Sequence, residues 1–332
     1  MRRFSLYFLL LLTLPLAGCS PFSSVAVLNP KGEQAKEQVD LITLSISLMA
    51  LVFLVVLILF IRFVYKYRQR PGYTPDPIHQ NRNKKFELIW TISPFIILFI
   101  LAVPMIQTTF GEEQESKSPS DLTVKVTASH YWWRFEYPGQ GIETAEELHL
   151  PKGKKVTLVL HSTDVIHSFW VPQLGGKLDV IPGRTNKLSL TPLENGTYQG
   201  KCAELCGKSH ANMRFKVKVE NEDDFNSWIA GLKSGNQTQS LSKSEAEGKS
   251  LFNENCLTCH AVEAQVENKK GPNLAGFAER ERVAGILPNT KEHLEDWMKD
   301  PQKFKPGSEM PKVKGLDKKE YEKLAEYLQT LH

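Results

Sequence analysis

The segment KCAELCGKSHANM, residues 201–213, places two cysteines, a histidine and a methionine within thirteen positions. It lies on an expected loop between Tyr198 and the segment MRFKVKVE, whose alternating apolar and polar residues predict a β-strand. A second histidine, His167 in DVIHSFWVP, also comes just after a predicted strand. Because loops at one end of a β-sandwich cluster in space, the two segments can meet there. The sequence therefore predicts a metal site built from both.

The residues around this segment predict an all-β domain over residues 121–232. Four stretches alternate apolar and polar residues at strand length: DLTVKVTAS, KKVTLVLHS, TNKLSLTP and MRFKVKVE. Turn-forming sequences separate them, namely PKGK, LGGK, IPGR and ENGT. Several short strands at this spacing predict a sandwich or Greek-key barrel of about one hundred residues, and NEDDFNSWIAGL predicts a closing helix.

The ligand types at the predicted site discriminate between metals. A structural zinc site would use Cys202, Cys206, His167 and His210 and leave Met213 without a role. A mononuclear blue-copper site uses one thiolate, so one cysteine would be left over. A disulfide between the cysteines would leave the second histidine and the methionine unexplained. Two thiolates, two imidazoles and a thioether fit two copper ions that share both sulfurs, and this hypothesis is favoured.

The residues from 245 to 332 change in character. The segments SEAEGKSLFNENC, TKEHLEDWMKD and DKKEYEKLAEYLQTLH show helical periodicity, with Ser244 and Thr290 as candidate N-caps. A polar stretch at 233–244 predicts a linker before this all-α domain. A core this small often needs a covalent staple or a cofactor to fold.

CLTCH, residues 256–260, has the spacing of a c-type haem attachment site. Cys256 and Cys259 would bond covalently to the haem, and His260 would be an axial ligand of the iron. The second axial ligand should lie well downstream, and Met310 in GSEMPKV is preferred to Met298, which lies in a predicted helix. A short disulfide or a redox dithiol are the alternatives, but neither requires the adjacent histidine.

Two apolar runs predict transmembrane helices at 41–63 and about 88–109, because roughly 20 residues of helix cross a bilayer. The loop between them, residues 62–85, carries seven basic side chains and one acidic side chain. Such a loop is predicted to face the cytoplasm, so both ends of the chain would be extracytoplasmic. The fold class predicted is therefore a multi-domain membrane protein with a transmembrane hairpin, a β-sandwich and an all-α domain.

The first residues predict a secretory signal, since two arginines precede an apolar run that ends in small residues. The sequence LAGC resembles a bacterial lipobox, in which residues 1–18 are removed and Cys19 becomes lipidated. The alternative is a third membrane helix with a buried cysteine. The run is short for a membrane span, which favours the lipoprotein interpretation and a bacterial cell membrane.

The segments HSFWVPQLGGKLDVIPGR and CAELCGKSHANM resemble the binuclear copper A site of cytochrome c oxidase subunit II. The resemblance covers most of the chain and implies a cupredoxin-like sandwich. It implies side-chain copper ligands at His167, Cys202, Cys206, His210 and Met213. It also implies that Glu204 contributes its backbone carbonyl, and that its carboxylate reaches a magnesium ion at the contact with subunit I. With the CLTCH domain, the whole resembles a caa3-type subunit II.

The same resemblance implies roles for two further regions. SHYWWRFEYP matches the aromatic stretch that leads electrons to copper A, with Tyr131 at the position usual for tryptophan and Trp132 and Trp133 beside it. For any single ring, a place in the sandwich core is the alternative. Glu87 matches the residue at the mouth of a proton channel that leads into subunit I. The alternative is that this acid only stabilises the helix that it begins, through the helix dipole.

The function implied is electron delivery within a proton-translocating oxidase. Electrons from cytochrome c would pass through haem c and copper A to subunit I, where haem a and the haem a3–copper B centre reduce oxygen. The expected partners are subunits I and III, with a cytochrome c or an upstream respiratory complex as the electron donor. No nucleic acid is expected to bind. A membrane-anchored copper chaperone and a free-standing electron-transfer lipoprotein are the alternatives.

Overall fold

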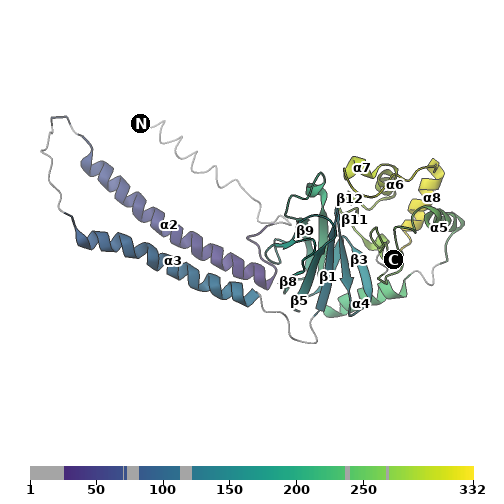
Figure 1. The fold of residues 1–332 in the computed structure, drawn as a ribbon, viewed down its shortest axis with the longest axis horizontal. Helices are drawn as coiled ribbons and strands as arrows, with labels where there is room; N and C mark the ends of the chain where they lie inside the picture. Colours follow the sequence, from purple (N-terminus) through teal and green to yellow (C-terminus); the bar gives the residue numbers. More distant parts are fainter. Residues whose placement is uncertain (1–25, 70, 73–81, 113–121, 236–239, 267–268) are drawn as a thin grey trace. The chain divides into compact units, whose positions relative to one another are not determined.

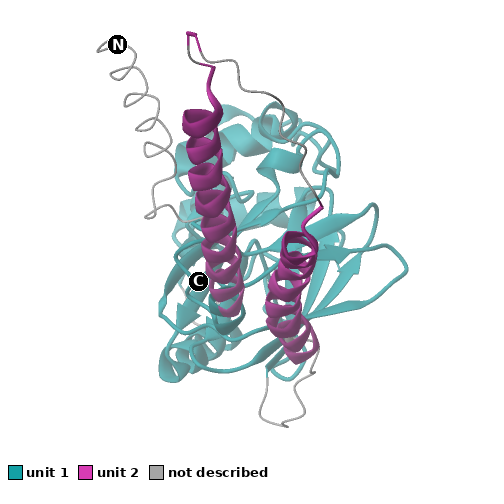
Figure 2. Ribbon diagram, turned by 90° about the vertical axis from the view of Figure 1, so that its left-hand side faces the viewer, with its two compact units in different colours: residues 1–36, 115–332 teal, residues 37–114 magenta. Residues whose placement is uncertain are grey.

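The computed structural model describes residues 26–69, 71–72, 82–112, 122–235, 240–266 and 269–332 (Figure 1). The chain divides into two compact units, residues 1–36 with 115–332, and residues 37–114 (Figure 2). The predicted signal peptide, residues 1–18, and Cys19 lie outside the described residues.

Two long helices account for the apolar unit, α2 (Glu33–Tyr67) and α3 (Lys84–Glu112). Both are long and apolar enough to cross a membrane. At 1.5 Å per residue the 35 residues of α2 measure about 52 Å, well beyond the roughly 30 Å of a hydrocarbon core. The helices therefore extend past the predicted runs at 41–63 and 88–109, because hydropathy marks only the part that lipid covers.

Three hydroxyl groups within α2 are satisfied locally, as lipid requires. The hydroxyls of Thr43, Ser45 and Ser47 donate to the carbonyl four residues earlier, at 2.7–2.8 Å. Large apolar side chains point outward along both helices; Phe99, for example, is 70% exposed. Such a surface is stable only in an apolar surrounding.

Two five-stranded sheets form the β-sandwich. The first has the order β3-β2-β1-β5-β8, with β1 (Leu122–Ser129), β2 (Trp132–Tyr137), β3 (Ile142–Ala145), β5 (Val156–Ser162) and β8 (Asn186–Leu190). The second has the order β4-β10-β9-β6-β7, with β4 (Glu147–Pro151), β6 (His167–Trp170), β7 (Leu178–Val180), β9 (Gly196–Cys202) and β10 (Arg214–Glu220). The pairs β1–β5 and β10–β4 are parallel, and the other pairs are antiparallel. The four predicted strands are β1, β5, β8 and β10, and the predicted fold class is confirmed.

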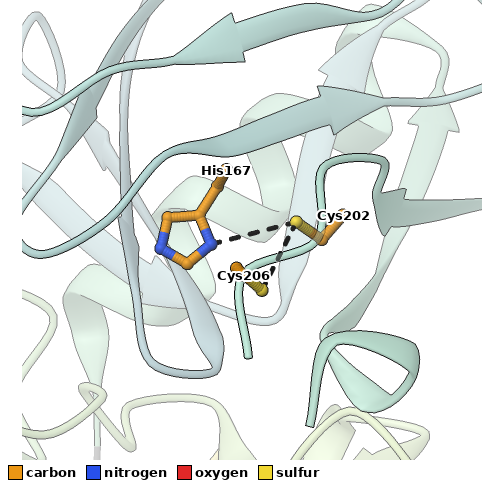
Figure 3. A group of neighbouring side chains, drawn as sticks. All are labelled: His167, Cys202 and Cys206. Carbon is orange, nitrogen blue, oxygen red and sulfur yellow. Dashed lines mark hydrogen bonds between the residues drawn. The ribbon is translucent and has the colours of Figure 1, made fainter. Parts of the chain in front are cut away.

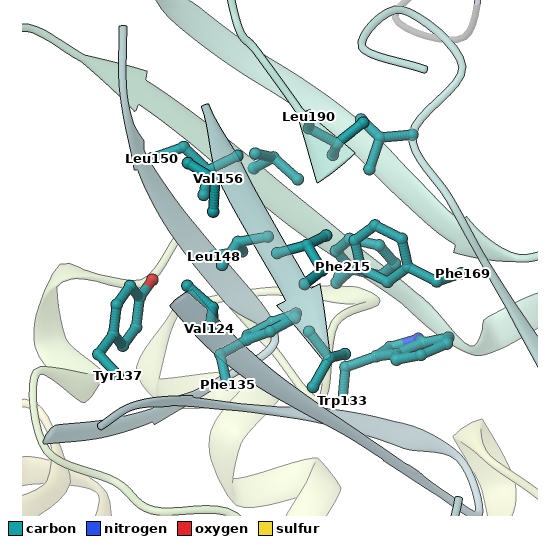
Figure 4. Close-up of a cluster of buried hydrophobic side chains, with 14 of the residues drawn as sticks. Val124, Trp133, Phe135, Tyr137, Leu148, Leu150, Val156, Phe169, Leu190 and Phe215 are labelled. Atoms are coloured by element: carbon teal, nitrogen blue, oxygen red, sulfur yellow. The ribbon is translucent and has the colours of Figure 1, made fainter. Parts of the chain in front are cut away.

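The core lies between the sheets and is rich in aromatic rings (Figure 4). Trp133, Phe135 and Tyr137 alternate along β2, so all three point to the same face, and each is fully buried. Phe169 from β6 and Phe215 from β10 stack against each other with centroids 4.8 Å apart. Burying side chains of this size stabilises the fold by about 1.5–3 kcal/mol each. The closing helix, α4 (Glu222–Ser234), buries residues at helical spacing against the same core.

The C-terminal domain contains α5 (Lys243–Asn255), α6 (Lys291–Lys299), α7 (Pro301–Phe304) and α8 (Lys318–Leu328), with a small ladder of β11 (Arg282–Val283) and β12 (Leu287–Pro288). Helices α5 and α8 approach so closely that a Cβ on Gly248 would lie 2.1 Å from the carbonyl oxygen of Lys323. Thr290 is the N-cap of α6, as predicted.

The predicted N-cap at Ser244 is wrong. Ser242 caps α5 in a capping box with Glu245: its hydroxyl accepts from the Glu245 amide, and the Glu245 carboxylate accepts from the Ser242 amide. The hydroxyl of Ser244 instead donates to Glu326 of α8. A tertiary contact, which local sequence does not reveal, distinguishes the two serines.

Candidate metal and haem sites

The predicted metal-binding side chains converge at one end of the sandwich. His167 begins β6, Cys202 ends β9, and Met213 immediately precedes β10, so three strand ends hold the site. Cys206 and His210 lie on the loop between Cys202 and Met213, which closes with a short 3₁₀ turn. His167 and Met213 are fully buried, and both cysteines nearly so. The site is thus rigid at its base and shielded from water.

The donor atoms lie within a few ångströms of one another (Figure 3). Cys202 Sγ lies 3.8 Å from both His167 Nδ1 and Cys206 Sγ. Cys206 Sγ lies 3.7 Å from His210 Nδ1 and 3.9 Å from Met213 Sδ. The backbone carbonyl of Glu204 lies 3.3 Å from Cys202 Sγ. The five side chains and the carbonyl singled out from sequence therefore form one cluster.

This cluster fits metal ions and does not fit a disulfide. A disulfide has its sulfurs about 2.05 Å apart, and the described cysteines are all unbridged thiols. A tetrahedron with edges of 3.8 Å has its centre about 2.3 Å from each corner, which is the length of a metal–thiolate bond. Thiolate, imidazole and thioether together are typical of copper.

The two thiols differ in acidity. The hydrogen bond from Cys206, opposed by burial and assisted by His167, lowers the pKa of Cys202. The same contact and burial raise the pKa of Cys206. Cys202 is therefore the thiol that loses its proton more readily, and metal binding releases the protons that remain on the pair.

Asp164 and His130 surround the cluster, and neither was identified from the sequence. The Nε2–H of His167 donates to Asp164 at 2.7 Å, which leaves Nδ1 of His167 facing Cys202. Burial alone would raise the pKa of Asp164, but hydrogen bonds from His167 and from backbone amides outweigh it and lower this pKa to about 2. His130 lies 3.1 Å from Asp164 and donates through Nε2 to the carbonyl of Cys206 at 3.0 Å. These contacts fix the orientation of the imidazole.

A second site is a mainly apolar cavity that is lined mostly by residues of the C-terminal domain. Its lining includes Cys256, Cys259, His260 and Met310, which are all the predicted haem residues. It also includes His130, Tyr131 and Trp132 of the β-sandwich. One wall of the cavity therefore belongs to the neighbouring domain, which the sequence did not indicate.

The side chain of His260 is oriented for metal binding. Its Nδ1–H donates to the carbonyl of Pro272 at 2.8 Å, so the other ring nitrogen is free of a proton. Burial lowers the pKa of His260, which keeps the ring neutral. A Cβ on Gly271 would lie 2.8 Å from the ring, so this position requires glycine. Burial raises the pKa of Cys256 to about 11, in contrast to the acidic Cys202.

The aromatic stretch is divided between two environments. Trp133 lies in the sandwich core with its ring centroid 6.2 Å from that of His167. Tyr131 is 6% exposed, and its hydroxyl accepts from the amide of Lys208 on the metal loop at 3.1 Å. Trp132 is half-buried and contacts the guanidinium of Arg134. Tyr131 thus lies between the cavity and the metal loop.

Glu87 is in the first turn of α3, where it pairs with Arg82 at 2.6 Å. The side chain of Asn83 accepts hydrogen bonds from the Lys85 and Phe86 amides at the start of this helix. An acid in the first turn is favoured by the helix dipole. The described contacts of Glu87 are therefore those of a helix-starting acid.

Three family models match the chain. They are the transmembrane domain of cytochrome c oxidase subunit II over residues 30–108, its periplasmic domain over residues 139–220, and cytochrome c over residues 245–332. The cytochrome c oxidase subunit 2 of Alkalihalophilus pseudofirmus is 41% identical over 327 residues, which cover 96% of this chain and 94% of that protein.

The chain belongs to the cytochrome c oxidase subunit II family. The subunit 2 of Bacillus subtilis is 40% identical, with 97% of this chain and 96% of that protein aligned. Among solved structures, the periplasmic domain of oxidase subunit II from Bradyrhizobium japonicum is 32% identical and covers 35% of this chain and 95% of its own, with a TM-score of 0.33.

The predicted family and function are confirmed by these matches. This subunit II has a fused cytochrome c domain, as in caa3-type oxidases, is a two-pass membrane protein and transfers electrons as part of the oxidase. Its cofactor classes are copper A and haem c, and its partner is subunit I. A chaperone or a free-standing lipoprotein is not favoured, because the matched relatives extend over nearly the full chain.

Proposed function

We propose that this subunit passes electrons from a covalently bound haem c to a centre of two copper ions. The haem residues are Cys256, Cys259, His260 and Met310, and the copper ligands are His167, Cys202, Cys206, His210, Met213 and the carbonyl of Glu204. When bound, the two metal groups supply reversible one-electron chemistry. The convergence of donor atoms from three strand ends, at 3.3–3.9 Å, is the observation that carries the proposal.

The arrangement of donors supports two metal ions. It has two matching halves: Cys202 with His167 at 3.8 Å and a carbonyl at 3.3 Å, and Cys206 with an imidazole at 3.7 Å and a thioether at 3.9 Å. The two sulfurs join the halves at 3.8 Å. Each half provides a thiolate, an imidazole and one weak donor, whereas a single tetrahedral ion would leave two donors unused.

The haem cavity and the metal loop are joined by the aromatic stretch, which we assign as the electron path. Tyr131 and Trp132 line the cavity, and Tyr131 also contacts the metal loop through Lys208. Trp133 continues toward the imidazole of His167. An electron leaving the haem would therefore cross packed side chains of this chain without passing through solvent.

The end of the sandwich that carries the metal loop is suited to subunit I. Three large apolar side chains beside the metal ligands are exposed, Val165, Ile166 and Leu205, the last at 79%. An exposed apolar patch of this kind is typical of a protein contact. We further propose that the carboxylate of Glu204 holds magnesium at this contact and that Glu87 lies at a proton channel of subunit I.

The remaining assignments concern topology and partners. We propose that residues 1–18 are a signal peptide, that Cys19 is lipidated, and that both metal domains are extracytoplasmic. The domain limits proposed are 19–120 for the membrane segment, 121–232 for the copper domain, 233–244 for the linker and 245–332 for the haem domain. Subunit III and a cytochrome c or upstream complex as donor complete the assembly.

Metal analysis of the full-length protein purified in mild detergent tests this function. The expected result is two copper atoms and one covalently bound haem iron per chain, in addition to the metals of the haem-copper subunit that co-purifies. His210→Asn should lower the copper content and leave the haem content unchanged. One metal atom per copper domain, or zinc in place of copper, would contradict the proposal.

A further inference from the structure

A short segment of the haem domain, residues 304–307, lies against the metal loop of the copper domain. The side-chain amide of Asn212 donates to the carbonyl of Phe304 at 3.1 Å. The hydroxyl of Ser209 donates to the carbonyl of Pro306 at 2.8 Å. Two side chains that alternate with the proposed copper ligands therefore bind the backbone of the haem domain directly.

Lys305, at the centre of this segment, is 2% exposed. Its ammonium group donates to the carbonyl of Tyr131 at 2.8 Å and pairs with the carboxylate of Glu146 at 3.2 Å. The side chains of the pair are 3% and 8% exposed. A buried lysine is costly unless it is paired and hydrogen-bonded, and here both conditions depend on the copper domain. Docking therefore buries this charge, and the copper domain supplies the partners that replace water around it.

Glu146 is held in place by its own backbone. It joins β3 to β4 with φ 64°, an unusual conformation for a residue other than glycine. Its amide donates to the carbonyl of Trp133 at 3.0 Å, and its carbonyl accepts from the amide of Lys216 at 2.9 Å. The chain crosses here between the two sheets, so the carboxylate faces the docked domain from a fixed position.

Two backbone amides elsewhere in the interface report whether the domains are docked. The amide of Glu281 in the haem domain donates to the carboxylate of Glu147 at 2.8 Å. The amide of Glu143 in the copper domain donates to the carbonyl of Ala264 at 2.7 Å. Each amide loses its partner when the domains separate.

We propose that Lys305 is a positioning residue that locks the haem domain onto the copper domain through Glu146 and the carbonyl of Tyr131. The lock holds the haem cavity against Tyr131 and Trp132, so that electron transfer between the two sites needs no diffusion. The inference deepens the proposed function and rests on it for this consequence. The lock itself depends only on protein contacts, and its test is independent of copper loading.

Hydrogen–deuterium exchange on the full-length, haem-containing protein in detergent measures this lock. Removing one partner of a buried ion pair should favour the undocked state by at least about a hundredfold. In K305M and in E146Q, exchange at the Glu143 and Glu281 amides should therefore rise by at least about a hundredfold. Exchange at Val126, in the central strand β1, should stay unchanged. In the double variant, the increase in exchange rate should be smaller than the product of the increases in the two single variants.

Lys312 provides a matched control, because it pairs with Asp300 at 2.8 Å on the surface of the same domain. K312M should leave both amides at the wild-type rate, since exposed pairs contribute little. Wild-type exchange at the two amides should also be the same at low and high salt, because a buried pair is weakly screened. This measurement needs no variant.

Three results would overturn the lock. The first is wild-type exchange at both amides in K305M and E146Q. The second is an equal rise at Val126, which would assign Lys305 to general stability. The third is faster exchange of the wild type in high salt, which would assign docking to surface charge. Failure of the two-copper assignment would leave these results unaffected, so the two proposals can fail separately.

Discussion

Asp164→Asn should weaken copper binding without unfolding the copper domain. The carboxylate accepts from His167 at 2.7 Å through one oxygen and from the amide of His130 at 2.7 Å through the other. Asparagine keeps one of these acceptors and presents an NH₂ donor in place of the second. Either the imidazole or the turn at His130 therefore loses its partner.

The size of the effect follows from this single lost contact. A hydrogen bond to a charged group contributes about 1.5–3 kcal/mol, which corresponds to roughly a 10- to 150-fold change in affinity. Removal of a group that orients a metal-binding histidine typically costs about 10- to 100-fold in affinity. The two estimates agree, so copper affinity should fall by one to two orders of magnitude.

Competition between the full-length protein and a copper chelator measures this change in copper affinity. The haem absorption spectrum checks that the haem domain is intact. Asp223→Asn, on the exposed first turn of α4, is the matched control and should retain wild-type affinity. Wild-type affinity in the Asp164 variant would refute the argument that this carboxylate holds His167 for copper.

Three other results are expected. Gly248→Ala should destabilise the haem domain by about 1–3 kcal/mol, measured by denaturant unfolding, because its Cβ would lie 2.1 Å from a backbone oxygen of α8; an unchanged midpoint would refute the close packing. Replacing Cys256 and Cys259 by serine should abolish covalent haem attachment, scored by haem staining on a denaturing gel, while copper content stays at the wild-type level. His149 should make the copper domain less stable as pH falls from 7.5 to 5.5, because burial lowers the pKa of this imidazole, so that it binds a proton in the unfolded chain at a higher pH than in the folded one. In thermal melts the difference in melting temperature between wild type and H149Q should therefore shrink toward pH 5.5. A difference that is the same at both pH values would contradict this prediction.

Local sequence was sufficient to propose the copper and haem residues. The spacing of Cys202, Cys206, His210 and Met213 falls within one loop, and CLTCH is a single short motif. The structure brings His167 to them because β6 and β9 are neighbours in one sheet. Alternating patterns also predicted four of the strands, since each has one face in the core.

Features that depend on contacts between residues far apart in the sequence could not be predicted from local sequence. His130 and Asp164 are separated by 34 positions and meet only because β1 pairs with β5. Lys305 is one of several lysines in its region, and its burial follows from docking of two domains. The helix ends at Glu33 and Tyr67 lie beyond the apolar run, where backbone hydrogen bonding continues after hydropathy has fallen.

Electron paramagnetic resonance of the full-length protein, oxidised and loaded with copper, distinguishes a centre of two copper ions from a single ion. We expect a hyperfine pattern from one unpaired electron shared equally by two copper nuclei, together with the signal of a low-spin haem. A pattern from a single copper nucleus, or a copper domain without a signal, would contradict the two-ion centre at Cys202 and Cys206.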